Sequence, residues 1–409
     1  MKYACIGEHL RHSFSKEVHN ALADYEYEIL EIPKTKLDSF MKERDFLGIN
    51  VTIPYKEAVI PYLYEIDEAA KAIGAVNTIV NKDGKLFGYN TDFYGMRELF
   101  RYNNISPKGK KAVILGSGGT AKTARAVLKS LGASEIITVS RGQKGGAISY
   151  SELYKSNADA EIMINTTPVG MFPNTYASPV DLDKFPKISG VVDAVYNPLR
   201  TTLVSSALKR GIPASSGLFM LVAQAVRASE LFTGKLYEEG ELQRVYEKIL
   251  TEKENVVLVG MPSSGKSTVG KELSSMLSRE FYDSDDFIEA RYGKIGDIFA
   301  NEGEMAFRNY ESEIIAELSL KTGAVIATGG GAVLREANVE ALKKNGKIFF
   351  LDKALEDLTP TESRPLSSSL EALKKRYEER YPIYESCADF KIEVSGTPSY
   401  VCEKIKELI

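Results

Sequence analysis

The chain has few cysteines, no long apolar run and no excess of positive charge. Its three cysteines, Cys5, Cys387 and Cys402, are too few and too far apart for a disulfide framework or a paired-cysteine zinc site, so we expect buried thiols. Nowhere do the roughly 18 consecutive apolar residues of a membrane span occur, and residues 1–19 lack the apolar stretch of a signal peptide. We therefore expect a cytoplasmic protein without membrane contact. A net charge of -4 argues against general nucleic-acid binding, because binding to phosphates needs concentrated positive charge.

The length and composition are those of a globular chain with more than one domain. At about 150 residues per domain, 409 residues predict two or three domains, and 44% apolar and 26% charged residues are enough for substantial cores. The charge is uneven, because residues 254–409 hold 20 basic and 27 acidic residues, a net charge of -7, whereas residues 1–253 carry +3. An anion site in the C-terminal part must therefore be built locally, from backbone amides and a few arginines.

Two segments share one plan, in which an apolar strand leads into glycines and then into a helix. One is residues 112–115 before Gly116-Ser-Gly-Gly-Thr-Ala, and the other is residues 256–259 before Gly260-Met-Pro-Ser-Ser-Gly-Lys-Ser-Thr. Each is typical of a nucleotide-binding unit. Later apolar segments predict a helix at 271–278 and strands at 136–139, 161–165, 190–194, 324–327 and 347–351. This alternation predicts parallel sheets covered on both faces, and Asn81-Lys-Asp-Gly predicts a tight hairpin before them.

Gly260-x-x-x-x-Gly265-Lys266-Ser267 fits the Walker A pattern in full, between a strand and a helix as that pattern requires. Its glycines let consecutive N–H groups and the helix N-terminus point at phosphate oxygens, while Lys266 adds charge and Ser267 can reach Mg2+. The alternative is a glycine-rich turn that only caps a helix. We expect ATP to contact Ser263, Ser264, Gly265, Lys266, Ser267 and Thr268.

The first glycine segment is a variant of the dinucleotide fingerprint, which places a pyrophosphate on the N-terminus of a helix. The residues that would line this loop are Gly116, Ser117, Gly118, Gly119 and Thr120. About 20 residues further on, where an NAD enzyme has Asp or Glu, Ser140, Arg141 and Lys144 offer a hydroxyl and cations, which favours the 2′-phosphate of NADP. The alternatives are a tight turn and solvated loop charges.

Nearly all of residues 254–409 resemble shikimate kinase. The motifs that carry the likeness are Asp283-Ser-Asp-Asp-Phe-Ile-Glu, Glu302-Gly-Glu-Met-Ala-Phe-Arg308, Gly329-Gly-Gly-Ala-Val, Arg364-Pro-Leu and Arg380-Tyr-Pro-Ile-Tyr384. The resemblance implies that Asp285 contacts the shikimate hydroxyls and is the candidate base, while Asp283 lies toward the Mg2+ side with Ser267. It also implies that Arg308 and Arg380 hold the shikimate carboxylate, that Gly329, Gly330 and Gly331 line the ring, and that Arg364 reaches the ATP phosphates from a lid.

Phosphoryl transfer makes those roles plausible, because its transition state depends on positioning and on neutralising charge. Taken alone, each arginine could instead form a surface ion pair, and Asp283 or Asp285 could be a helix N-cap. One departure lies in the lid: the family commonly carries another arginine shortly before Arg-Pro-Leu, whereas this chain has Leu358-Thr-Pro-Thr-Glu-Ser. We expect a compact, mobile loop between 353 and 369.

Residues 1 to about 250 resemble shikimate dehydrogenase. The motifs are His12-Ser13-Phe-Ser15 with His19-Asn20, Gly48-Ile-Asn50-Val-Thr52-Ile-Pro-Tyr-Lys56, Gly74-Ala-Val-Asn77-Thr, Gly88-Tyr-Asn-Thr-Asp92, Asn165-Thr-Thr-Pro-Val-Gly-Met171, Asp193-Ala-Val-Tyr196-Asn-Pro and Gly217-Leu-Phe-Met-Leu-Val-Ala-Gln224-Ala. The resemblance implies substrate contacts from Ser13, Ser15, Thr52, Asn77, Asp92, Tyr196 and Gln224. It implies a catalytic pair of Lys56 and Asp92, and it places Asn165, Thr166, Thr167, Ala194 and Gly217 along the cofactor.

Reduction of a ketone develops negative charge on oxygen, so such a site needs a proton donor, and Lys56 can supply it while Asp92 orients the ammonium. The alternatives are a surface lysine and a turn at 90–92. Departures from the family pattern are Glu8-His9, Lys16 and Ser140. We expect these departures to affect the geometry of the loops and the affinity for the cofactor more than the catalytic step.

All three histidines, His9, His12 and His19, fall within eleven residues, which admits a zinc site completed by Glu8 and Glu17. Capping or pocket roles are the alternative reading. The apolar run 218–226 predicts a core helix, and Gln224 interrupts it with a polar side chain.

Together these features predict an α/β chain with three domains. A substrate domain at 1–100 is completed by helices at 217–250, and a Rossmann-type NADP domain occupies 101–216. A linker at 251–255 leads to a P-loop kinase-type parallel αβα domain at 256–409. The resemblances imply reduction of 3-dehydroshikimate with NADPH and phosphorylation of shikimate with MgATP. Alternatives are a quinate reductase, a first unit that retains NADP as a scaffold without chemistry, and a second unit that only senses ATP. The oligomeric state stays open.

Overall fold

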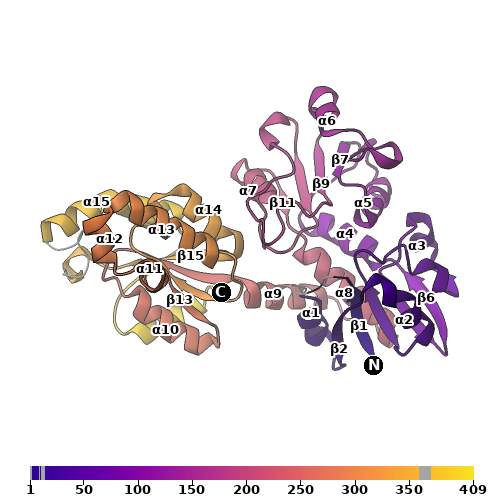
Figure 1. Ribbon diagram of the computed structural model, residues 1–409, viewed down its shortest axis with the longest axis horizontal. Coiled ribbons are helices and arrows are strands. Elements are labelled where there is room, and N and C mark those ends of the chain that lie inside the picture. The colour runs from indigo at the N-terminus through magenta and orange to yellow at the C-terminus, as the bar shows by residue number, and fades with distance from the viewer. Residues whose placement is uncertain (1, 9, 11–13, 359–369) are drawn as a thin grey trace. The chain divides into compact units, whose positions relative to one another are not determined.

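The computed structural model describes residues 2–8, 10, 14–358 and 370–409 and contains two compact units, Met1–Ile249 and Leu250–Ile409 (Figure 1). Both units alternate strands and helices, which confirms the predicted α/β class. The residues that we predicted as a linker, 251–255, belong to regular elements except for Glu254. They form the end of helix α9 (Glu241–Lys253) and the first residue of strand β12 (Asn255–Val259).

The N-terminal lobe of the first unit is a mixed sheet with helices against it. Its strands are β1 (Tyr3–Gly7), β2 (Tyr27–Glu31), β3 (Gly48–Val51), β4 (Glu65–Ile66), β5 (Thr78–Lys82) and β6 (Lys85–Tyr89), and its helices are α1 (Ser15–Leu22), α2 (Leu37–Glu43) and α3 (Glu68–Ile73). The strand order is β2-β1-β3-β5-β6-β4, with β1 parallel to both neighbours. The antiparallel β5–β6 hairpin turns at Asp83 and Gly84, both with positive φ, which confirms the predicted hairpin.

The second lobe of this unit is a parallel sheet in the order β11-β10-β9-β7-β8. Its strands are β7 (Lys111–Leu115), β8 (Glu135–Val139), β9 (Ile162–Asn165), β10 (Gly190–Asp193) and β11 (Ala214–Ser215), and its helices are α5 (Gly119–Ser130), α6 (Tyr150–Ser156) and α7 (Thr202–Lys209). Alternate side chains of β7 enter two different apolar cores, with Ile114 in one and Val113 in the other, because both faces are covered. The four predicted strands are confirmed, and β11 is an addition.

Helices α4 (Thr91–Tyr102) and α8 (Leu218–Thr233) connect the two lobes. They approach closely at Gly95, where a Cβ atom would lie 2.6 Å from the carbonyl oxygen of Met220. The first half of α8 contributes Phe219 to the core of the parallel lobe, and its last turns contribute Phe232 to the core of the N-terminal lobe. The predicted core helix at 218–226 is therefore the start of an element that packs into the cores of both lobes.

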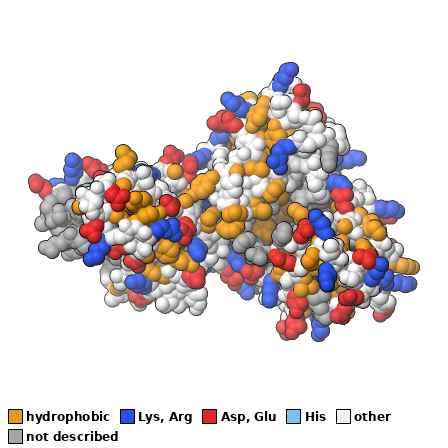
Figure 2. Space-filling view, viewed as in Figure 1, with side chains coloured by type: hydrophobic (Ala, Val, Ile, Leu, Met, Phe, Trp, Pro, Cys, Tyr) orange, Lys and Arg blue, Asp and Glu red, His pale blue; other side chains and the backbone are white. Residues whose placement is uncertain are grey.

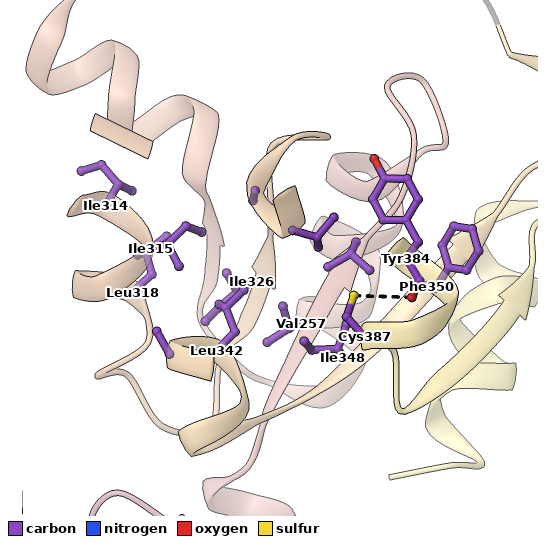
Figure 3. Close-up of a cluster of buried hydrophobic side chains, with 14 of the residues drawn as sticks. Val257, Ile314, Ile315, Leu318, Ile326, Leu342, Ile348, Phe350, Tyr384 and Cys387 are labelled. Atoms are coloured by element: carbon purple, nitrogen blue, oxygen red, sulfur yellow. Dashed lines mark hydrogen bonds between the residues drawn. The ribbon is translucent and has the colours of Figure 1, made fainter. Parts of the chain in front are cut away.

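The second unit is a parallel sheet, as predicted, and its strand order is β13-β14-β12-β15-β16. Besides β12, its strands are β13 (Phe281–Asp283), β14 (Val325–Ala327), β15 (Gly346–Asp352) and β16 (Phe390–Glu393), and its helices are α10 (Lys266–Leu277), α11 (Ser284–Tyr292), α12 (Ile295–Asn301), α13 (Gly303–Leu318), α14 (Glu336–Asn345), α15 (Leu370–Cys387) and α16 (Pro398–Lys406). Figure 3 shows one apolar core of this unit, where Val257 and Ile326 of the sheet meet Ile315 of α13 and Tyr384 of α15. The helix predicted at 271–278 begins earlier, at Lys266, directly after the glycine loop.

The surface mixes both signs of charge, and on the face in Figure 2 Lys and Arg side chains are interspersed with Asp and Glu on each unit. Cys5, Cys387 and Cys402 are all free and buried, which confirms the prediction for these thiols. Within the described ranges, none of the helices has both the length and the apolar character needed to cross a bilayer.

Candidate active sites

Lys56 and Asp92 form an ion pair in the first unit. Lys56 lies in the turn after β3, and Asp92 is the second residue of α4. Lys56 Nζ donates to Asp92 Oδ2 at 2.5 Å, and the two side chains are only 14% and 10% exposed. Asn90 caps α4 by accepting from the Phe93 N–H at 3.1 Å, so Asp92 lies in the first turn, where the helix dipole favours a carboxylate. The predicted pair is thus an ammonium held in one place by a fixed carboxylate.

A connected set of buried polar side chains includes Thr91, the residue before Asp92 on α4. Asn77 Oδ1 accepts from the Thr91 N–H at 2.7 Å, and Asn77 Nδ2 donates to Gln224 Oε1 at 3.5 Å. Thr91 Oγ1 is 3.0 Å from Thr78 Oγ1, which accepts from Asn50 Nδ2 at 3.0 Å. The structure therefore brings the predicted Asn77 and Gln224 together. We did not predict Asn50 or Thr91, and the available signal for Asn50 was a polar residue inside a fully buried strand.

The remaining predicted substrate residues come from three other segments. Ser15 is buried at the start of α1. Thr52 is half-buried, and its N–H donates to the Ile6 carbonyl at 2.9 Å. Tyr196 is half-buried, with its ring centroid 5.3 Å from that of Phe14. Ser13 lies outside the described residues.

The glycine loop at 116–120 presents backbone rather than side chains. Gly116 has φ 113°, and a Cβ there would lie 2.6 Å from Thr166 Oγ1, so this position needs glycine. Helix α5 begins at Gly119, and its N-cap residue is Gly118. Because glycine has no side chain, Gly118 makes no side-chain hydrogen bond to the first N–H groups of the helix. Ser117 is exposed and Thr120 is half-buried. Such a bare helix start can bind a pyrophosphate.

The predicted site for the 2′-phosphate lies at the end of β8. Ser140 is 7% exposed, and its Oγ meets no hydrogen-bond partner among the described residues. A buried hydroxyl of this kind fits a ligand that supplies the missing hydrogen bond. Arg141 is exposed, as a cation that meets a phosphate from solvent must be. The side chain of Lys144 lies outside the described part of the chain.

Two loops at the carboxyl ends of β9 and β10 are tied together by Asp193, which we did not predict. Asp193 Oδ1 accepts from Asn165 Nδ2 at 2.9 Å and from the Val195 N–H at 3.0 Å, and its Oδ2 accepts from Thr201 Oγ1 at 2.8 Å. Burial raises the pKa of Asp193 to about 7, although these three hydrogen bonds act in the opposite direction. Asn165 also accepts from the N–H and hydroxyl of Thr167. The predicted cofactor segment 165–167 is therefore fixed by a buried carboxylate.

His19 is fully buried in the N-terminal lobe. Its ring stacks on Tyr27 with centroids 3.8 Å apart, and its Nδ1 is 2.6 Å from the Tyr25 hydroxyl. No group of three or more His, Cys, Asp or Glu that could hold a metal occurs within residues 2–8, 10, 14–358 and 370–409. His9 and His12 lie outside these ranges. His19 is buried against tyrosine rings in the core of the N-terminal lobe, and its predicted capping or pocket role stays a prediction.

Burial lowers the pKa of His19 from 6.5 to about 3, which makes a testable prediction for stability. Between these values the unfolded chain binds a proton that the folded chain does not. Above pH 6.5, His19 therefore makes no contribution to the pH dependence of the free energy of unfolding. As the pH is lowered from 6.5 to 3, its contribution decreases the free energy of unfolding by roughly 1.4 kcal/mol per pH unit. We expect His19→Asn to flatten this slope. Urea unfolding at several pH values, read by pulse proteolysis with the second unit as internal control, measures it, and equal slopes would contradict the prediction.

The Walker A loop in the second unit has the backbone that its glycines allow. Gly260 has φ 147°, and a Cβ there would lie 2.8 Å from the Leu351 carbonyl oxygen, while Gly265 adopts φ 94° at the N-cap of α10. Lys266 is buried, and its Nζ donates to the carbonyls of Gly260 and Met261 at 2.9 Å each. The ammonium thus lies over the loop, where phosphate oxygens would meet it.

Three further residues of this loop bear on nucleotide binding. Ser264 Oγ is buried and has no hydrogen-bond partner within the described chain, so a ligand atom fits there. Ser263 has φ 65°, which turns its backbone into the loop, and Thr268 is the third residue of α10. The alternative reading as a plain helix cap does not explain the buried hydroxyl.

Ser267 and Asp283 meet beside the loop. Ser267 Oγ donates to Asp283 Oδ2 at 2.6 Å, while Asp283 Oδ1 accepts from the Asp285 N–H at 3.0 Å as the N-cap of α11. The N-cap alternative and the predicted role are thus compatible, because each uses a different oxygen. A hydroxyl and a carboxylate oxygen in contact fit Mg2+, which prefers oxygen ligands.

The two predicted arginines line the glycine segment 329–331. Arg308 is 8% exposed, its Nη1 donates to Glu311 Oε2 at 2.7 Å, and a Cβ on Gly331 would lie 2.1 Å from that nitrogen. Arg380 is 7% exposed and donates to the Gly330 carbonyl at 3.1 Å. Arg308 forms a buried ion pair with Glu311, and it also pairs with Glu304 at 3.1 Å, whose side chain is 51% exposed, so the alternative reading as a surface pair holds in part.

Glu311 and Asp285 lie at the same glycine segment. A Cβ on Gly329 would be 2.6 Å from Asp285 Oδ1 and 2.8 Å from Glu311 Oε1. Burial raises the pKa of Glu311 and the neighbouring Arg308 lowers it. We did not predict Glu311, although its spacing of three residues from Arg308 on α13 was a signal for a pair. Arg364 lies outside the described residues, so its predicted role is untested.

By fold and by site, the chain is an enzyme with two nucleotide-dependent units, an oxidoreductase with a Rossmann lobe followed by a P-loop phosphotransferase. A model of the shikimate dehydrogenase substrate binding domain matches residues 5–79, and a model of shikimate kinase matches residues 262–409. Shikimate dehydrogenase (NADP(+)) of Clostridium perfringens is 37% identical in an alignment 265 residues long, which covers 60% of this chain and 97% of that protein.

Solved structures give the same result for the first unit. Shikimate dehydrogenase 1 of Peptoclostridium difficile matches with a TM-score of 0.57 and 34% identity, covering 61% of this chain and 97% of that one. Shikimate 5-dehydrogenase of Thermus thermophilus, solved with NADP(H) and shikimate, matches with a TM-score of 0.54 and 31% identity, covering 61% and 99%. The chain belongs to the shikimate dehydrogenase family and carries a shikimate kinase domain in its C-terminal unit.

Proposed function

We propose that the chain is a bifunctional enzyme that reduces 3-dehydroshikimate to shikimate with NADPH and phosphorylates shikimate with MgATP. The observation that carries the first activity is the largely buried Lys56–Asp92 pair at 2.5 Å. It lies against the glycine loop, since a Cβ on Gly119 would be 3.6 Å from Lys56 Cδ. A ketone reductase requires at least a proton donor next to a dinucleotide-binding loop.

In the reductase site, bound NADPH supplies the hydride. Lys56 holds a proton at Nζ for the oxygen that gains charge, and Asp92 keeps the ammonium oriented. Asn77 and Gln224, with Ser15, Thr52 and Tyr196, offer hydrogen bonds to the ring substituents, as Ser13 would. The pair is only 14% and 10% exposed, which reduces the screening of these interactions by solvent.

In the kinase site, Lys266 and the loop N–H groups neutralise phosphate charge, and Ser267 with Asp283 would hold Mg2+. Arg308 and Arg380 present two buried cations for the ring carboxylate, since Arg pairs well with planar anions. Asp285 receives the hydroxyl proton or orients the hydroxyl. Glu311 holds Arg308 in place, and Gly329 to Gly331 give the ring a flat wall.

A single-pot assay tests both activities in the intact chain. With 3-dehydroshikimate and NADPH, then ATP and Mg2+, we expect NADPH oxidation followed by ADP release. NADPH oxidation without any ADP release would favour the ATP-sensing alternative. No NADPH oxidation, together with ADP release only after shikimate itself is added, would favour a first unit that only binds NADP. Faster oxidation of quinate than of shikimate in the reverse direction would favour the quinate alternative.

Gly217 provides a steric test of the cofactor cleft. A Cβ at this position would lie 2.3 Å from the Ala194 carbonyl oxygen, and backbone cannot move aside as a side chain can. Overpacking of this kind costs about 1–3 kcal/mol, so we expect Gly217→Ala to weaken NADPH binding by roughly tenfold or more. Calorimetric titration with NADPH measures this, with kinase turnover in the same preparation as the folding control. Unchanged affinity would show that this contact does not shape the cleft.

We also expect the enzyme to act in the cytoplasm. Support comes from its three cysteines, which are all free. Free thiols persist in a reducing compartment. A cell fractionation that recovers the chain in another compartment would contradict this expectation.

A further inference from the structure

An ion pair connects the two lobes of the first unit beside the Lys56 turn. Lys122 of α5 and Glu57, the residue after Lys56, lie with Nζ 2.8 Å from Oε1. Their side chains are 42% and 55% exposed, so the pair stands at the surface rather than inside the cleft. One partner belongs to the lobe with the mixed sheet and the other to the lobe with the parallel sheet.

Each partner is attached to a part of the reaction machinery. Glu57 follows Lys56 directly, and the Lys56 carbonyl accepts from the Val76 N–H at 2.8 Å, which fixes this turn on its own lobe. The Lys122 N–H donates to the Gly118 carbonyl at 3.1 Å, so Lys122 lies one turn into α5, next to the cofactor loop. The lobes also lie close together at this place, since a Cβ added to Gly119 would be in ordinary contact with Lys56 Cδ, at 3.6 Å.

We propose that Glu57 and Lys122 are positioning residues that form a clasp between the lobes and keep Lys56 at its working distance from the cofactor loop. The inference rests on the proposed reductase activity and adds to it a contact that involves neither ring nor cofactor. An exposed pair of this kind changes an equilibrium by about two- to fivefold, which corresponds to roughly 0.4–1 kcal/mol. A weak clasp suits a cleft that must open to release product in each turnover.

Two other roles are physically reasonable for these charges, and both make different predictions. Glu57 could act on Lys56 through its own charge, because the two residues are adjacent. Lys122 could act on cofactor phosphates directly, because a cation near the start of α5 lies close to the loop. In either case the effect of one residue would not depend on the other, whereas in a clasp the two effects are shared.

A double-mutant cycle in the full-length chain separates these roles. The variants are Glu57→Gln, Lys122→Met and the double variant, with Lys129→Met as a matched control that removes an exposed lysine elsewhere on α5. We expect each single variant to lower kcat/KM for 3-dehydroshikimate about two- to fivefold, the double variant to lower it no further, and Lys122→Arg to retain the wild-type value. High ionic strength should reduce the wild-type advantage.

Four results would overturn the clasp. Additive losses would mean that the residues act independently. A shift in the pH profile of kcat with Glu57→Gln alone would assign Glu57 to the charge of Lys56. Weaker NADPH binding with Lys122→Met alone would assign Lys122 to the cofactor. Wild-type rates in all variants would leave the ion pair without a role in turnover. If the wild-type chain itself does not reduce 3-dehydroshikimate, the proposed function has failed and not the clasp alone.

Discussion

Lys56→Met should abolish reduction of 3-dehydroshikimate and leave phosphorylation of shikimate at its full rate. Methionine keeps the length and apolar stem that lie beside Gly119, so the substitution removes little besides the ammonium. Without Nζ, the proton donor is lost and the Asp92 carboxylate, only 10% exposed, loses the partner that it has at 2.5 Å. Loss of a general acid lowers kcat by roughly 10^2- to 10^4-fold. Spectrophotometry of NADPH oxidation measures the first activity, and ADP release measures the second.

The matched control for this prediction is Lys71→Met, which removes an exposed lysine from α3 in the same lobe and should leave both activities unchanged. Asp92→Asn should also slow reduction, and combining it with Lys56→Met should add little because the two side chains act as one unit. A Lys56→Met variant that keeps more than about a tenth of the wild-type kcat would remove Lys56 from the general-acid role.

Most of the fold could be predicted because strands buried on both faces of a parallel sheet appear as short apolar runs. Residues 112–115 and 256–259 are such runs, and each leads into glycines. The two-residue strand β11 could not be predicted, because two residues are too few to show the apolar pattern of a strand. The start of α10 was misplaced for another reason: Lys266 and Ser267 belong both to the loop motif and to the first turn, and polar residues there conceal the helix.

The candidate sites could be predicted where a motif contains the reactive group itself. Lys56 with Asp92, and Ser267 with Asp283, lie far apart in the sequence and form direct hydrogen bonds in the structure. The roles of these residues stay predictions until the variants are measured. The same holds for Ser13 and Arg364, which lie outside the described residues.

The residues that sequence reasoning missed share one physical property, which is that they act on other protein groups. Asp193 holds two loops, Glu311 holds Arg308, and Asn50 joins a hydrogen-bonded chain to Thr78. Their partners become apparent only after folding. Each position does carry a signal in the sequence: Asp193 and Asn50 are polar residues in strands that are otherwise apolar, and Glu311 lies three residues after Arg308 on α13. A buried polar residue needs a partner, so such positions predict a network without saying which one.

Asp285→Asn should abolish phosphorylation of shikimate and leave the reductase unaffected. Asp283 fixes the Asp285 backbone through the helix cap, and the Asp285 carboxylate lies against Gly329, at the segment that Arg308 and Arg380 line. An amide has similar size but cannot take up the hydroxyl proton. We expect kcat to fall by roughly 10^2- to 10^4-fold, measured as ADP release in the presence of saturating shikimate.

The neighbouring Asp286→Asn is the matched control, because Asp286 is exposed and lies in the same first turn of α11. Both substitutions remove one carboxylate from a helix N-terminus, which changes helix stability by about 0.3–1 kcal/mol in each case, so a general loss of stability would affect the two alike. Only the Asp285 variant should lose turnover. Its kinetic pattern then separates two roles: a fall in kcat at unchanged KM marks the proton acceptor, whereas a rise in KM at unchanged kcat marks a residue that only binds the hydroxyl. Equal activity of the two variants would place the acceptor elsewhere, and Glu311, the other carboxylate against Gly329, would be the next to test.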